Sequence, residues 1–267
     1  MSEPPDEGVV AGAREDLARR MLVAVRGSGE DLGDLVHDGS EDVLRALAAN
    51  PGLDEDDLLQ LLARRDLPVD LLRQVATDVK RSGSYRVRLA LLRNPATPAS
   101  VSLRFVSQLH LFDLVAVSMI PAIPREVKTA AEGAVLAQVR QVPLGARVSL
   151  ARRTGSEAIL LRLLVDHEAR VVEAALANPR VTEATVARAL RDPMAPPHTV
   201  DQVARSSRWS VRRDIRIAIV RNRHTPTGRA LQLVSTMTRD ELRMLSRDSA
   251  VPAQIRSYIV ASMGKKS

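Results

Sequence analysis

The chain contains only four asparagines, and their spacing constrains the fold more than any other feature of the sequence. The interval from Asn50 to Asn94 equals the interval from Asn178 to Asn222, and an offset of 128 relates the first pair to the second. Each asparagine closes an apolar run, in the order RALAANP, LALLRNP, EAALANP and IAIVRNR. Such a regular period indicates an internal repeat, which has to be recognised before local patterns are interpreted.

Sliding the sequence on itself by this offset aligns residues 18–133 with residues 146–261 without a gap. The identities include rare residues as well as common ones, among them Gly27 with Gly155 and Thr97-Pro98 with Thr225-Pro226. A shared composition bias would spread matches over several offsets and would not favour rare residues. We therefore predict that the chain is a tandem duplication with an offset of 128.

Each asparagine is expected to end a helix, because apolar residues three and four apart precede it. Asparagine tolerates the left-handed conformation of a helix C-cap, and the proline that follows three of the four prevents the helix from continuing. The next helices are expected to begin a few residues later, with a side chain as N-cap. The predicted N-caps are Asp54, Thr97, Thr182 and Thr225.

Prolines mark further helix starts, since proline is tolerated in a first turn and not in a helix interior. Helices are expected to begin near Pro68, Pro124, Pro196 and Pro252, and Pro98 and Pro226 suit the first turn of two others. Residues 87–92 and 215–220 nearly alternate between apolar and polar, which alone favours strands. Their equivalents in the repeat have helical spacing, so we predict helices there as well.

Short helices of this kind cannot each bury an apolar face alone, but stacked in register they share one continuous core. The predicted fold is therefore all-α, an α-solenoid of short stacked helices. Residues 1–12 are expected to form a flexible acidic tail, residues 13–140 the first half, residues 141–263 a basic second half and residues 264–267 a flexible tail.

Three segments resemble leucine-rich repeat variant units, which are relatives of HEAT and armadillo repeats. They are VLRALAANPGLDEDDLLQLLARRD, VRLALLRNPATPASVSLRFV and VVEAALANPRVTEATVARALRD. The resemblance implies a curved all-helical superhelix that is used chiefly for binding, and it specifies no activity. Some members of that family carry cysteine clusters, whereas this chain has no cysteine.

Composition excludes several kinds of chemistry. Without cysteine the chain has no disulfide, thiolate nucleophile or cysteine-ligated metal. None of the five histidines forms a His-x-x-x-His pair. The acidic N-terminal residues and the short apolar stretches predict neither a signal peptide nor a membrane span, so we expect a cytoplasmic protein. We predict no catalytic, cofactor or metal site, and therefore a protein that is not an enzyme.

Positive charge is concentrated toward the C-terminus. Residues 1–80 carry 9 basic and 18 acidic side chains, whereas residues 81–267 carry 30 basic and 14 acidic ones. The densest basic segment is residues 206–224, in which Trp209 is the single tryptophan. The candidate binding residues for an anionic partner are Lys80, Arg88, Arg93, Arg208, Trp209, Arg212, Arg213, Arg216 and Arg221.

Two interpretations of these residues stay open. Arg93 and Arg221 lie next to the asparagines, where a cation stabilises a helix C-terminus whatever the function. Trp209 suits core packing, and it also suits stacking on a ligand.

The main functional hypothesis is a scaffold that binds a protein or an acidic peptide along a groove. The alternative is a nucleic-acid-binding protein that uses the basic face of the second half.

Overall fold

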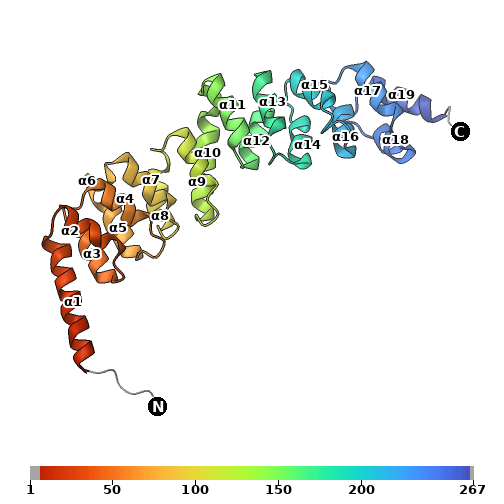
Figure 1. Cartoon of the computed structure of the whole chain (residues 1–267). Helices are drawn as coiled ribbons and strands as arrows, with labels where there is room; N and C mark the ends of the chain where they lie inside the picture. The colour runs from red at the N-terminus through yellow and green to blue at the C-terminus, as the bar shows by residue number, and fades with distance from the viewer. Residues whose placement is uncertain (1–6, 265–267) are drawn as a thin grey trace, which may run out of the picture. The chain divides into compact units, whose positions relative to one another are not determined.

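The computed structural model describes residues 7–264, and every regular element within this range is helical. The helices are short and follow one another along the chain (Figure 1). The predicted all-α, helical-repeat architecture is thereby confirmed. Residues 7–12 belong to the first helix and residue 264 to the last, and the rest of the expected tails, residues 1–6 and 265–267, lies outside the described range.

The chain divides into two compact units, Met1–Ala134 and Val135–Ser267. Unit 1 contains α1 (Glu7–Arg26), α2 (Glu30–Gly33), the 3-10 helix η1 (Asp34–His37), α3 (Glu41–Ala49), α4 (Glu55–Ala63), α5 (Val69–Thr77), α6 (Val79–Ser82), α7 (Tyr85–Arg93), α8 (Ala99–Val106) and α9 (Leu111–Ser118). The dividing line falls within α10 (Arg125–Gln138).

Unit 2 continues with the 3-10 helix η2 (Val139–Gln141), α11 (Leu144–Arg153), α12 (Glu157–Leu164), α13 (Ala169–Ala177), α14 (Glu183–Arg191), α15 (Pro197–Arg205), α16 (Arg213–Arg221), α17 (Thr227–Ser235), α18 (Arg239–Ser246) and α19 (Ala253–Gly264). Five helices of unit 1 recur in unit 2 at the offset of 128, with both ends preserved. In order, α3, α4, α5, α7 and α9 correspond to α13, α14, α15, α16 and α18.

Each unit packs its helices in two rows. In unit 2, α12, α14 and α16 pack in succession, and α11, α13 and α15 form the second row. In unit 1, α4 packs on α7, while α1, α3 and α5 pack in succession. Because most of the described helices have only eight to ten residues, the apolar face of each is covered by both rows together.

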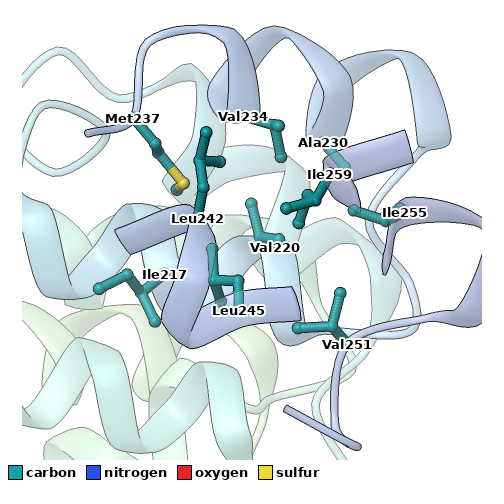
Figure 2. Close-up of a cluster of buried hydrophobic side chains, with 10 residues drawn as sticks. All are labelled: Ile217, Val220, Ala230, Val234, Met237, Leu242, Leu245, Val251, Ile255 and Ile259. Carbon is teal, nitrogen blue, oxygen red and sulfur yellow. The ribbon is translucent and has the colours of Figure 1, made fainter. Parts of the chain in front are cut away.

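One core cluster of unit 2 shows how this burial is shared (Figure 2). Its side chains come from four successive helices, α16 to α19, and from the turns between them. They are Ile217, Val220, Ala230, Val234, Met237, Leu242, Leu245, Val251, Ile255 and Ile259. Spacings of three and four residues within each helix place these side chains on one face, which is the pattern of an amphipathic helix.

The four asparagines do end α3, α7, α13 and α16, but the predicted left-handed conformation is wrong. Their backbone is extended, with φ from −81° to −62° and ψ from 119° to 129°. The physical reason lies in their side chains, which are buried and reach a helix of the preceding repeat. The Nδ2 atoms of Asn50, Asn94, Asn178 and Asn222 donate to the carbonyl oxygens of Ala24, Leu62, Ala151 and Leu190 at 2.9, 2.8, 2.7 and 2.5 Å.

The same asparagines also start the next turn. Each Oδ1 accepts a hydrogen bond from the backbone N–H two residues later, at 2.7 to 2.9 Å. The last carbonyls of a helix have no partner within their own helix, and burial without one is costly. Each asparagine therefore caps a neighbouring helix and shapes its own loop, which explains why one residue type recurs at these four positions.

Two of the four predicted N-caps are confirmed. The side chain of Asp54 accepts the N–H of Asp57 at 2.8 Å, and Thr182 Oγ1 accepts the N–H of Thr185 at 3.2 Å. The prediction is wrong for Thr97 and Thr225, because the N-caps of α8 and α17 are the prolines that follow them. Thr225 instead donates to the carbonyl of Ile219 near the end of α16.

The proline-marked starts and the two ambiguous segments behave as the repeat predicts. Helices α5, α10, α15 and α19 begin one residue after Pro68, Pro124, Pro196 and Pro252. Residues 87–92 lie within α7 and residues 215–220 within α16, so both are helical despite their alternating sequence. Helix α16 buries residues on most of its circumference, Ile215 and Ile217 to Val220, whereas α7 buries only Val87, Leu91 and Leu92.

Candidate binding groove

The predicted basic residues divide between the two units, and most of those in unit 2 gather around α16. Arg212 is the N-cap of α16, and Arg213, Arg216 and Arg221 lie within it. Each of these guanidinium groups lies near a carboxylate. The distances are 2.8 Å from Arg212 to Glu183, 3.0 Å from Arg213 to Glu241, 3.9 Å from Arg216 to Glu241 and 2.6 Å from Arg221 to Asp248.

These ion pairs connect successive helices of one row. Arg212 joins the start of α16 to α14, and Arg213 joins α16 to α18. A similar pair between Arg188 and Glu157, at 2.8 Å, joins α14 to α12. The basic residues that the sequence groups together are therefore largely paired with carboxylates of neighbouring helices.

Two of these carboxylates, Glu241 and Asp248, have pKa values below the ordinary values of their side chains. A hydrogen bond from the backbone N–H of Thr238 lowers the pKa of Glu241, and Arg213 lowers it further against the opposing effect of burial. The backbone N–H of Ala250 and the guanidinium of Arg221 lower the pKa of Asp248 in the same way. At neutral pH these acids therefore stay bound to their arginines.

Trp209 is a packing residue in this structure. It is 2% exposed, its Nε1 donates to the carbonyl of Leu176 at 3.3 Å, and the guanidinium of Arg208 lies 4.4 Å from the centre of its ring. The equivalent residue of unit 1, Arg81, donates to the equivalent carbonyl, that of Ala48. The two residues thus cap the same helix end, and the geometry favours core packing over stacking on a ligand.

The three candidates in unit 1 have different surroundings. Lys80 is exposed on the short helix α6. Arg88 donates to the carbonyl of Ser82 at 3.2 Å, and its Nε is buried without a hydrogen-bond partner. Arg93 pairs with Asp113 at 3.1 Å. Arg88 and Arg216 occupy equivalent positions and share the buried, unpartnered Nε.

A groove follows the α14–α16 contact in unit 2. It consists of two adjoining cavities of about 560 and 480 Å³, which share Arg191 and Arg221 as lining residues. The larger cavity lies at the loops that follow α14, α16 and α18, and includes Asn222. The smaller one lies over the helices, and its apolar lining is Ala184, Ala187, Ile217 and Met244.

Unit 1 has a groove of about 450 Å³ in the equivalent place, between α4 and α7. Nine of its ten lining positions have their repeat equivalents among the lining positions of the unit 2 groove. Leu59 and Leu89 of unit 1 correspond to Ala187 and Ile217, and Arg93 corresponds to Arg221. The repeat therefore produces the same concave feature twice, with different side chains.

Arg191 distinguishes the unit 2 groove. It is exposed at the end of α14, and it forms no ion pair or hydrogen bond with the described part of the chain. The equivalent residue in unit 1 is Ala63. The sequence prediction did not include Arg191 because this residue lies outside the densest basic segment, residues 206–224, and next to Asp192.

Comparisons with protein-family models, with curated proteins and with solved structures find no match for this chain. Within residues 7–264, no helix has the length and apolar character needed to cross a membrane. No group of three or more histidine and acidic side chains in the same range is placed to hold a metal ion.

Proposed function

We propose that this chain is a non-enzymatic helical-repeat scaffold that binds a protein or peptide partner in its grooves. The observation that supports the proposal is the recurrence of one groove, at equivalent lining positions, in both units. The matching helix ends support a tandem duplication as its origin. A surface that is formed twice while its side chains change is typical of repeat proteins, whose stacked helices serve as binding surfaces.

The ion pairs around α16 argue for a peptide rather than a nucleic acid as partner. Nucleic-acid binding relies on cations that are available to phosphates. Arg212, Arg213 and Arg221 already contact carboxylates at 3.0 Å or less, and the pKa values of two of those carboxylates are lowered. A phosphate would have to displace these acids, whereas an apolar side chain can occupy the groove without disturbing them.

The proposal is tested by selecting random twelve-residue peptides, displayed on phage, against the full-length protein. Ala184→Trp is designed to fill the unit 2 groove, since Ala184 is exposed and lines it. Ala49→Trp, at an exposed position that lines neither groove, is the matched control. We expect enriched peptides that bind the control as they bind the wild type and lose binding to Ala184→Trp. Failure to enrich any peptide would contradict the proposal.

A further inference from the structure

The cations and carboxylates of the unit 2 groove are almost all engaged within the protein. Glu183 pairs with Arg212, Asp248 with Arg221, and Asp214 lies 3.8 Å from Arg213. Asp192, the fourth carboxylate of the lining, accepts the backbone N–H of Met194 at 2.8 Å.

The remaining basic residues of the lining are Arg191, Arg223 and His224. Arg223 donates to the carbonyl of Pro193 at 3.1 Å and to His224 at 3.2 Å. Arg191 alone has no partner among the described residues. A guanidinium in this position is free to form a bidentate pair with a carboxylate supplied from outside.

The apolar part of the groove adjoins this guanidinium. Ala184, Ala187 and Ile217 form an apolar lining between α14 and α16, here called the floor, and Met244 of α18, which is 39% exposed, lines the same cavity. Methionine adapts its shape to different apolar side chains. Since Arg191 lines this cavity as well as the larger one, an apolar side chain seated here would have its neighbours along a peptide close to Arg191.

The charge of unit 2 as a whole favours an acidic occupant. Residues 135–267 carry 23 basic and 11 acidic side chains, whereas residues 1–134 carry 16 and 21. A positive unit attracts an acidic segment over distances up to the screening length, and the effect weakens as salt increases.

We propose that the unit 2 groove binds a segment of a partner protein in which an acidic residue lies next to a large apolar side chain, with Arg191 selecting the acid. This inference rests on the proposed function and specifies its ligand. The apolar residue occupies the floor formed by Ala184, Ala187, Ile217 and Met244, and the carboxylate pairs with Arg191. At the equivalent position of unit 1 Ala63 replaces the arginine, and the lining guanidinium without a partner among the described residues is there Arg65, at the position of Pro193.

The test compares peptide selections on three proteins: the wild type, Arg191→Ala and Arg188→Ala. Arg188 is the matched control, because it lies on the same helix and pairs with Glu157 outside the groove lining. We expect acidic residues next to leucine, isoleucine, methionine or phenylalanine in peptides from the wild type and from Arg188→Ala. Peptides from Arg191→Ala should keep the apolar residue and lose the acidic preference.

A selected peptide then provides a quantitative check by fluorescence anisotropy. Replacing its acidic residue by the matching amide should weaken binding to the wild type about tenfold, which corresponds to about 1.4 kcal/mol, and should not weaken binding to Arg191→Ala. Two results would overturn this inference and leave the proposed function intact. In the first, the selected peptides bind but show no preference for acidic residues. In the second, peptides selected on Arg191→Ala show the same acidic preference as those selected on the wild type. No selected peptide at all would overturn both.

Two other occupants would also overturn the inference. A dimer that forms with increasing concentration and is abolished by Ala184→Trp, detected by analytical ultracentrifugation, would assign the groove to a second copy of the chain. Binding of a fluorescein-labelled twenty-nucleotide oligothymidylate that is lost in Arg191→Ala would assign it to a nucleic acid. Circular dichroism establishes that each variant is folded.

Discussion

The groove of unit 1 has Ala63 where that of unit 2 has Arg191, and Pro95 where that of unit 2 has Arg223. The helices that form the two grooves nevertheless begin and end at equivalent residues. The asparagines and the buried aliphatic side chains set the positions of the helices in both units. The exposed lining residues can differ between the two grooves because they face solvent and contribute little to stability. The comparison teaches that function in this chain is to be sought where the copies diverge.

A second difference concerns the first residue of the equivalent helices α7 and α16, whose side chain contacts a carboxylate in both units. In unit 1, Tyr85 donates its hydroxyl to Asp113 at 2.5 Å. In unit 2, the equivalent residues are Arg213 and Glu241, joined at 3.0 Å. The contact is kept, but the donor changes from a tyrosine hydroxyl to a guanidinium, and in unit 1 the carboxylate of Asp113 also pairs with Arg93.

The largest expected effect tests whether Trp209 and Arg81 are equivalent. Trp209→Ala should destabilise unit 2 by about 3 to 5 kcal/mol, because it leaves a cavity and removes a donor from the carbonyl of Leu176. Trp209→Arg, which introduces the residue of unit 1, should lose less. Hydrogen exchange followed by mass spectrometry measures each unit separately. An equal loss for both substitutions would contradict the equivalence.

Substitution of the asparagines should lower the stability of the two units by similar amounts. Asn178→Asp removes the donor to the carbonyls of Ala151 and Thr154, which lie 2.7 and 3.0 Å away, and places a negative charge against them. Each buried carbonyl left without a partner costs about 1 to 3 kcal/mol. Asn94→Asp should cost a similar amount in unit 1. At pH 7 each aspartate variant should lose more unfolding free energy than the alanine variant at the same position. Urea unfolding monitored by hydrogen exchange gives this loss for all four variants.

Lowering the pH should weaken the contact between α16 and α18, because it protonates Glu241. Its pKa is lowered in the folded state, so its contribution to stability is present above the unfolded pKa and is lost as the pH falls through the folded value. Glu241→Gln should cost about 1 to 3 kcal/mol at pH 7 and progressively less below about pH 4.5. Urea unfolding monitored by Trp209 fluorescence reports unit 2 alone. A constant difference between pH 7 and pH 3 would show that the carboxylate charge does not hold this contact.

The smallest effect is expected for the exposed ion pair that joins α12 to α14. Arg188 and Glu157 are each more than half exposed, so the pair contributes no more than about 1 kcal/mol and is weakened by salt. Arg188→Ala and Glu157→Ala should therefore shift the unfolding midpoint slightly, and the double variant should match the sum of the two within about 0.5 kcal/mol. A coupling of several kcal/mol would mean that the ion pairs, rather than the asparagines, hold the repeats together.

The sequence predicts the architecture well because its signals are local and repeated. Helical spacing before each asparagine, together with prolines at helix starts, suffices to place most of the short helices. The conformation of the asparagines could not be predicted in this way. Their partners, such as the carbonyl of Ala24 for Asn50, lie more than twenty residues away, so the hydrogen bond exists only once the repeats are stacked.

The candidate site was harder to predict, because charge along the sequence does not reveal which charges are already paired. Arg213 and Arg221 belong to the densest basic segment, yet their partners Glu241 and Asp248 come from the following repeat. In the sequence Arg191 lies next to Asp192 and outside the basic segment, so the local charge pattern does not indicate a binding residue. Its place between two cavities depends on the packing of α14 against α16.

The most direct test of the account is to locate a bound peptide. A peptide selected on the wild type is synthesised with a benzophenone photo-crosslinker next to its apolar residue, and the cross-linked protein is digested and sequenced by mass spectrometry. We predict cross-links to α14, α16 and α18, at residues 183–191, 213–221 and 239–246, and their loss in Ala184→Trp. Cross-links confined to the other row of unit 2, in α11, α13 or α15, would contradict the claim that the repeated groove is the binding site.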